Sequence, residues 1–190
     1  GTANVGAITL VSGTTGKTVT GDSFQVLSTN SLHGTTVNDF VGSGSVTALT
    51  NGNFVSANKF WNIESAGASS VGAVTLVSGT TGKVVSDSSF EVLSSNSLHG
   101  TTASDRFGGD GVTKLASGNF VASSSVWDNG GTTDAGVVTL VNGLTGKAAV
   151  NNSFVVSTTN SLVGTAASAG TSVLAVDSTN KTFAAQFKDN

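Results

Sequence analysis

Short apolar stretches alternate with polar turns along the whole chain, and this alternation predicts β-strands. VTAL at 46–49 and FVSA at 54–57 flank the polar sequence TNGN, and VGAVTLV at 71–77 and SFEVL at 89–93 follow. β-Branched Val and Thr fit a pleated sheet, whereas Gly, Asn and Ser fit turns. Asn51-Gly52 is a strong hairpin signal, because a type I′ turn needs positive φ at both central residues. We therefore expect about four short antiparallel strands in this region.

The same pattern occurs three times. VGAITLVSGTTGK at 5–17 recurs almost unchanged at 71–83, and again as AGVVTLVNGLTGK at 135–147. The sequence SVTALTNGNFV at 45–55 is matched at 111–121. A spacing of about 65 residues predicts supersecondary units that bury their apolar faces against one another. The predicted fold is all-β, with three such repeats of about four antiparallel strands each, similar to propeller blades.

A parallel β-helix is the alternative fold. A repeat of this length could be three coils of about 21 residues, and a β-helix also stacks without limit. The Asn-Gly turns and the GAVTL strands suit that fold too. We favour blades, because the long period is clear and a period of one third of it is weak.

The chain is divided unevenly with respect to this repeat. We interpret 1–42 as the C-terminal part of a repeat, 43–110 and 111–170 as repeats, and 171–190 as the N-terminal part of a repeat. A half-repeat leaves strand edges unpaired, and such edges are templates for pairing. The halves could close a ring within one chain, or the tail of one chain could complete the head of the next.

Complementation between chains predicts an interface built from the apolar residues of the two half-repeats. The donated face is expected to consist of Val173, Leu174, Val176 and Phe183. The accepting face is expected to consist of Val5, Ile8 and Leu10.

Aromatic residues recur at fixed places in the repeat. We interpret five of them as core residues: Phe24, Phe54, Phe90, Phe120 and Phe154. Trp61 and Trp127 follow two of these positions at the same spacing. They are either core anchors between repeats, which we favour, or an exposed aromatic platform for a glycan or protein ligand.

The segment 105–146 resembles an FG-GAP unit of integrin-type β-propellers. The matching residues are Phe107-Gly108, Leu115, Phe120-Val121 and Gly136–Leu140. The repeats are also similar to those of very large filamentous-haemagglutinin-type bacterial surface proteins. The resemblance implies a blade-like fold and a cell-surface location. At the place of the FG-GAP calcium loop stands Asn51-Gly52-Asn53, which has no carboxylate, and calcium sites need carboxylate oxygens.

Composition narrows the range of functions. Charged residues make up 10% of the chain and the net charge is −3, which disfavours nucleic-acid binding because phosphate affinity needs clustered Lys and Arg. There is no Cys for a disulfide or thiolate zinc site, and no apolar run approaches the length of a membrane span. Low charge with abundant Ser, Thr, Gly and Asn is common in secreted bacterial surface proteins. Without Met or a signal-peptide pattern, the chain is expected to be a processed or excised piece.

The sequence contains no recognisable arrangement of catalytic residues. His33 and His99 share one repeat position, where the third repeat has Val163, so we expect neither a catalytic nor a metal role for them. There is no G-x-S-x-G elbow and no phosphate-binding loop. One Lys follows a Gly turn in each copy of the repeated block. We interpret these three residues as solvated residues that discourage edge pairing: Lys17, Lys83 and Lys147. We expect no enzyme activity, no cofactor and no metal.

The sequence thus predicts an extracellular structural protein, a subunit of a surface fibre that assembles head to tail with copies of itself. The alternative is a cell-surface adhesin that binds a glycan or protein through loops around the two Trp residues.

Overall fold

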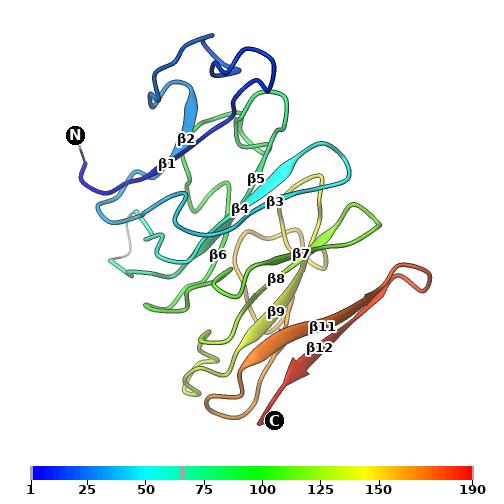
Figure 1. The fold of residues 1–190 in the computed structure, drawn as a ribbon. Coiled ribbons are helices and arrows are strands. Elements are labelled where there is room, and N and C mark those ends of the chain that lie inside the picture. Colours follow the sequence, from blue (N-terminus) through cyan, green and yellow to red (C-terminus); the bar gives the residue numbers. More distant parts are fainter. Residues whose placement is uncertain (1, 65–66, 190) are drawn as a thin grey trace.

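The computed structural model describes residues 2–64 and 67–189, and within these ranges it contains strands, bridges and turns but no helix. Four sheets follow one another along the molecule (Figure 1). The first contains β1 (Ala7–Thr9) and β2 (Ser31–His33), and the last contains β11 (Thr171–Asp177) and β12 (Thr182–Phe187). The second sheet has the order β3 (Val46–Ala48), β4 (Phe54–Asn58), β5 (Ala73–Val77), β6 (Leu98–His99). The third has the order β7 (Val112–Lys114), β8 (Phe120–Ser124), β9 (Val137–Val141), β10 (Leu162–Val163).

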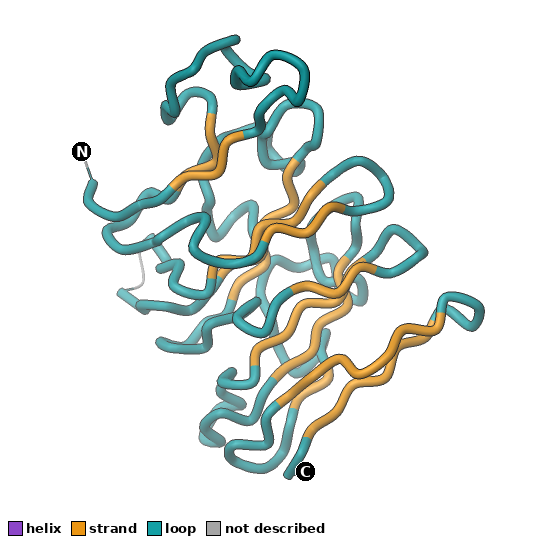
Figure 2. The backbone as a smooth tube through the Cα atoms, viewed as in Figure 1, coloured by secondary structure: helices purple, strands orange, loops and turns teal. Residues whose placement is uncertain are grey.

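Neighbouring strands are antiparallel in every one of these sheets. The predicted all-β fold with repeats of four antiparallel strands is therefore confirmed, and the parallel β-helix alternative is wrong. Figure 2 shows the strands as successive layers joined by long turns and loops. The two terminal sheets lie at opposite ends of this stack, so they do not close a ring within the chain (Figure 1).

The β3–β4 hairpin closes by a different turn from the one predicted. The backbone N–H of Leu49 donates to the carbonyl of Asn53 at 2.8 Å, which leaves a three-residue loop. Gly52 has a φ of +86°, whereas Asn51 stays outside the left-handed region. A three-residue loop with Gly in the left-handed conformation is the common alternative to a type I′ turn. Gly118, with a φ of +87°, holds the same place in the β7–β8 hairpin.

A glycine precedes β5 because a later segment of the repeat passes directly over it. Gly72 has a φ of +77°, and a Cβ atom there would lie 2.2 Å from the backbone nitrogen of Phe107. That nitrogen instead donates to the carbonyl of Val71 at 2.9 Å. Gly6 has the same relation to Val41. From here on, 1–42 is called the first repeat, 43–110 the second and 111–170 the third. This close approach explains why Gly recurs at the start of the most regular sequence block.

The hydrophobic cores lie between successive sheets, and β5 is buried along its whole length. Ala73 and Val77 pack in the core shared with the first repeat, whereas Val74 and Leu76 pack in the core shared with the third. One strand serves two cores because successive side chains in a strand point to opposite faces. The first core also contains Leu32, Trp61, Val84 and Val92, and the second contains Val55, Leu98, Phe107, Phe120, Val141 and Val156.

Backbone hydrogen bonds also cross from each repeat to the next. His33 forms a parallel bridge with Glu91. The N–H of His33 donates to the carbonyl of Phe90 at 2.8 Å, and the N–H of Val92 donates to the carbonyl of His33 at 3.0 Å. His99 makes the corresponding bridge with the third repeat. The repeats are therefore joined by directional bonds as well as by apolar packing.

A buried Asn closes the long loop of each repeat. The Oδ1 atom of Asn96 accepts hydrogen bonds from Leu93 N at 2.9 Å and Ser97 Oγ at 2.8 Å, and its Nδ2 donates to the carbonyl of Glu91 at 2.9 Å. Ser97 Oγ in turn meets Thr75 Oγ1 across the sheet at 2.8 Å. Asn30 and Asn160 make the same contacts in the other repeats.

Replacing Asn96 with Ala should lower the free energy of unfolding by about 3 kcal/mol, because it removes the hydrogen bonds of this side chain to Leu93 N, the Glu91 carbonyl and Ser97 Oγ. Urea unfolding followed by Trp fluorescence measures this loss. Ser95→Ala, at an exposed site in the same turn, is the control and should change stability by less than about 0.5 kcal/mol. Equal effects of the two substitutions would contradict the structural role of Asn96.

Candidate assembly interface

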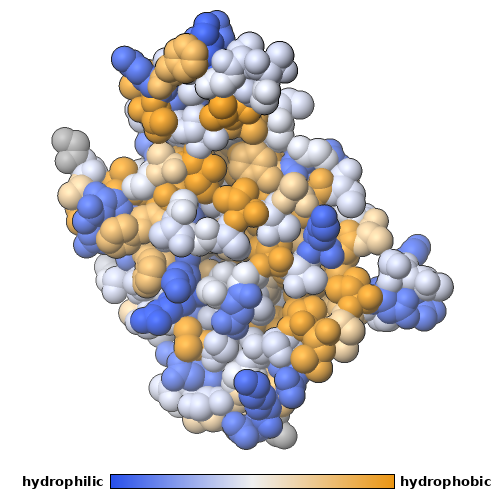
Figure 3. All heavy atoms as spheres, in the orientation of Figure 1, coloured by the Kyte–Doolittle hydropathy of each residue, from blue (hydrophilic) through white to orange (hydrophobic). Residues whose placement is uncertain are grey.

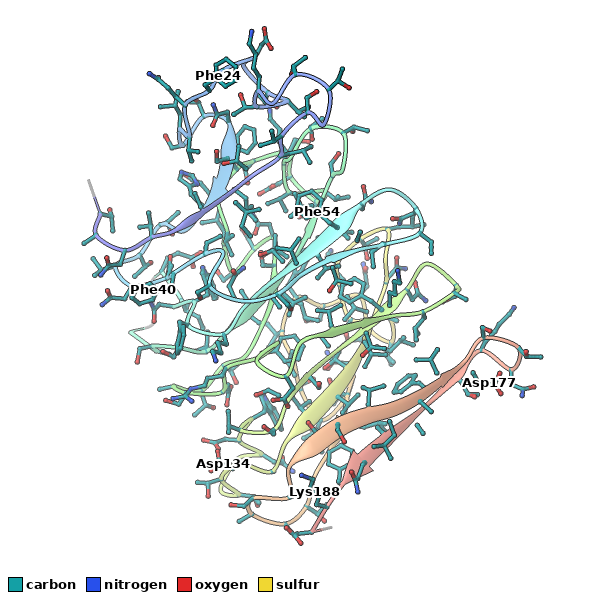
Figure 4. All side chains as sticks on the ribbon, in the orientation of Figure 1. Phe24, Phe40, Phe54, Asp134, Asp177 and Lys188 are labelled. Atoms are coloured by element: carbon teal, nitrogen blue, oxygen red, sulfur yellow. The ribbon has the colours of Figure 1, made fainter. Side chains whose placement is uncertain are left out.

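The first repeat presents apolar side chains on the face that points away from the rest of the stack. Val11 is 50% exposed, Val26 is 63% exposed and Phe24 is 76% exposed. The matching Val77 and Val92 in the second repeat are fully buried. Phe24 lies at the outer end of the first repeat (Figure 4), where hydrophobic side chains gather on the surface (Figure 3). This face thus matches the surface of the second repeat that the first repeat covers.

The prediction that Phe24 is a core residue is wrong, because its side chain is mostly exposed. Of the other four recurrent Phe residues, Phe120 is buried and three are half-buried: Phe54, Phe90 and Phe154. Phe24 has the same sequence context as Phe90 and Phe154, and these two lie against a preceding repeat within residues 1–190.

The recurrent Lys residues lie over recurrent Phe rings. The Nζ atoms of Lys17, Lys83 and Lys147 are 5.7, 5.3 and 5.0 Å from the ring centroids of Phe24, Phe90 and Phe154, respectively. These distances are typical of cation–π contacts. The interpretation of these Lys residues as merely solvated therefore missed one of their contacts.

The opposite end of the stack carries a groove. Leu162 is 55% exposed there, whereas the matching Leu32 and Leu98 are fully buried. The groove has a volume of about 380 Å³ and is lined by Val138, Leu140, Val150, Leu162 and Phe183, together with the polar segment 158–161. The second-repeat residues that match Val138, Leu140 and Leu162 are Val74, Leu76 and Leu98, and the third repeat covers them.

The two terminal sheets are complementary in strand order. By sequence, β12 matches β4 and β8, and β1 matches β5 and β9. Within the described residues, β12 pairs with β11 and β1 pairs with β2, so each has one edge without a strand partner. In the second sheet, Ser56 pairs with Thr75, and the corresponding residues at the ends are Ala185 and Thr9. Placing β12 beside β1 of another copy would reproduce the order of a complete sheet.

The residues predicted for the accepting face lie elsewhere. Ile8 packs against the first core, and Leu10 lies against Gly82 of the second repeat. Val5 is half-buried, and its carbonyl accepts a hydrogen bond from Val41 N at 2.9 Å. Ile8 and Leu10 therefore face the chain's own second repeat, and the open face is formed instead by Val11, Phe24 and Val26.

The residues predicted for the donated face all lie on the C-terminal hairpin. Phe183 lines the groove, Val173 is half-buried and Leu174 is 62% exposed at a β-bulge. Val176 is partly exposed and lines a small cavity with Leu115 of the third repeat.

Both Trp residues are buried, which removes the exposed ring face that an aromatic platform would need. Trp61 Nε1 donates to the carbonyl of Val92 at 3.1 Å, and its ring lies 5.8 Å from that of His99. Trp127 Nε1 makes no hydrogen bond within the described part of the chain. The two Trp residues thus serve as core anchors.

The histidines are held by backbone carbonyls. His33 Nδ1 lies 2.8 Å from the carbonyl of Phe90, and His99 Nδ1 lies 2.6 Å from that of Gly100. Burial lowers the pKa of His33, with the charge of Glu91 opposing this effect. Across residues 2–64 and 67–189, no group of three or more His, Cys, Asp or Glu side chains is placed to hold a metal ion. No helix in these ranges could cross a membrane.

Two buried carboxyl groups shape the loops between repeats. Asp105 Oδ2 accepts hydrogen bonds from Thr101 N and Thr102 N at 2.8 and 2.7 Å, and its Oδ1 accepts one from Asp128 N at 3.1 Å. Asp39 makes the corresponding contacts in the first repeat. Burial raises the pKa of both Asp residues, although these hydrogen bonds oppose the increase.

Comparison with known protein families gives one match. Residues 1–43, 48–109 and 114–172 each match the family described as Repeat of unknown function (DUF5650). The chain therefore belongs to this repeat family, and the comparison does not support an assignment to the FG-GAP or integrin family. Searches of curated proteins and of solved structures found no match.

The pKa of Asp105 leads to a prediction about pH. Because burial raises the pKa of Asp105 above its ordinary value of 3.8, the folded chain still binds this proton in a pH range in which the unfolded chain releases it. Raising the pH through that window therefore removes stability. Asp105→Asn cannot ionise, so its free energy of unfolding should fall less steeply with rising pH than that of the unmodified chain.

Urea unfolding at a series of pH values measures this slope. Asp177 is an opposite control, because hydrogen bonds from Asn180 and Thr179 lower its pKa. Asp177→Asn should make the fall with rising pH steeper. An unchanged slope in Asp105→Asn would show that this carboxyl group has the same pKa in the folded and unfolded chains.

Proposed function

We propose that this protein is an extracellular structural protein that assembles head to tail into a surface fibre. Its repeats form the body of the fibre, and its two end faces join one copy to the next. The proposal gives the chain a mechanical role and assigns it no reaction.

The observation that carries this proposal is the contrast in burial between matching positions. Val26 is exposed where Val92 is buried, and Leu162 is exposed where Leu98 is buried. Val26 lies on the open face of the first repeat, and Leu162 lies on the open face of the third repeat. The open face of the first repeat therefore matches the face that the second repeat turns toward the first. The open face of the third repeat matches the face that the second repeat turns toward the third.

Strand pairing supplies the direction of the joint. With β1 of a second copy beside β12, the strand order becomes β11-β12-β1-β2, which matches β3-β4-β5-β6. A contact between two different faces is heterologous, so it propagates as a filament unless the rotation between copies closes a ring. Strand addition of this kind gains main-chain hydrogen bonds along the new edge.

Burial of the exposed side chains supplies the driving force. Phe24, Val26 and Leu162 would each contribute about 2 kcal/mol if fully covered. Charged residues make up only 10% of the chain and its net charge is −3, so repulsion between copies opposes association only weakly. The same composition supports the extracellular location that we propose.

The 190-residue chain should therefore associate as its concentration rises. Sedimentation velocity over a range of concentrations measures this, and electron microscopy should show unbranched fibres. A chain that stays monomeric at every concentration would overturn the proposed function.

An engineered disulfide tests the strand joint directly, because the chain has no Cys of its own. Thr9→Cys with Ala185→Cys in one chain should give a ladder of linked chains on a non-reducing gel. Thr75→Cys with Ser56→Cys is the matched internal control, since these residues pair within one sheet. The control pair should link within the chain and give no ladder.

A further inference from the structure

The boundary between two repeats is built from a loop as well as from strands. At the second boundary, His99 N donates to the carbonyl of Phe154 at 2.9 Å, and Val156 N donates to the carbonyl of His99 at 3.1 Å. These two bonds form a parallel bridge between His99 and Val155. His33 and Glu91 form the same bridge at the first boundary. The loop after the Lys turn is thus anchored to the preceding repeat at both internal boundaries.

The side chains on either side of this bridge enter the core between the repeats. Val156 is buried in the second core, and Phe154 packs against that core at its margin. The preceding repeat supplies Val74, Leu76 and Leu98 to the same core. Val92 has the matching place in the first core, together with Leu32.

The two ends of the chain carry the two halves of this boundary separately. Val163 stands at the repeat position of His33 and His99, and Gln25 stands at the position of Glu91 and Val155. Around Val163, the groove is lined by Val138, Leu140 and Leu162, which match the residues that the second repeat supplies to the second core. Around Gln25, the exposed side chains are those of Phe24 and Val26.

We infer that the groove of about 380 Å³ beside β10 binds the loop 18–27 of a second copy of this chain. Val163 and Gln25 form the parallel bridge of this joint, and Phe24 and Val26 cover Leu162 and its neighbours. The occupant follows from continuity with the two internal boundaries, where the same loop fills the same position. This inference rests on the proposed head-to-tail assembly and adds a second contact to the strand joint.

A joint with two separate contacts restricts rotation about either one. The β12–β1 ladder fixes one line of contact between the copies. The loop fixes a second contact on another element, so the junction reproduces the geometry of an internal boundary. The fibre would then be a continuous stack in which the junctions between chains have the same strand order and the same kind of bridge as the boundaries within a chain.

A second disulfide pair tests this contact. Gln25→Cys with Val163→Cys in one chain should give a ladder of linked chains under oxidising conditions. His99→Cys with Val155→Cys is the internal control, because these residues bridge within one chain. The control should link within each chain and give no ladder.

A charge in the loop gives an independent measurement. Val26→Asp should weaken association at least about tenfold in sedimentation velocity, a loss equivalent to about 1.4 kcal/mol. Leu144→Asp is the control, because Leu144 is 69% exposed in a turn and does not line the groove, and this variant should associate like the unmodified chain. Trp fluorescence and circular dichroism verify that both variants fold.

The outcomes separate the two proposals. If Thr9→Cys/Ala185→Cys links chains while Gln25→Cys/Val163→Cys does not, the loop contact is overturned and the strand joint stands. The loop contact is also overturned if a folded Val26→Asp chain associates like the unmodified protein. If neither pair links chains and the protein stays monomeric, both proposals are overturned.

Discussion

The structure depends on one constraint, which is that each sheet has two apolar faces and needs a neighbour on both. β5 shows this most clearly, since Ala73 and Val77 belong to one core while Val74 and Leu76 belong to the next. A single repeat cannot bury its own apolar side chains, because its sheet has no second layer within the repeat. Stability therefore comes from the interfaces between repeats, as in other linear repeat proteins. The exposed residues at the two ends follow from the same constraint.

Polar groups determine how the layers are aligned. Apolar packing alone is non-directional, whereas the bridges at His33 and His99 allow one register between neighbouring repeats. The buried hydroxyl pairs and the Asn that closes each long loop hold the bridging segments in place. The third repeat departs from this pattern on its outer side, where Ala169 replaces the buried Asp and Val163 replaces the His. Val163 still offers the backbone groups on which a bridge depends.

Much of the fold could be predicted from the sequence because its signals are local. Gly, Asn and β-branched residues mark turns and strands, and three nearly identical blocks reveal the repeat. The turn at Asn51-Gly52 was predicted in position but not in type, since a three-residue loop also places Gly in the left-handed region. The candidate interface was harder to predict. Alternation along β1 gives two apolar sets, and the sequence does not tell which set faces the second repeat. The sequence pattern therefore places Ile8 on the open face and Phe24 in the core, whereas in the structure Ile8 packs against the first core and Phe24 is exposed.

A reconstruction of the assembled chain by electron cryomicroscopy tests this account most directly. If each open face is covered by the opposite face of another copy, the density should show an unbroken series of sheets. The step between sheets across a chain junction should then equal the step within a chain. Single particles with both end faces in solvent, or copies joined through any other surface, would contradict the account.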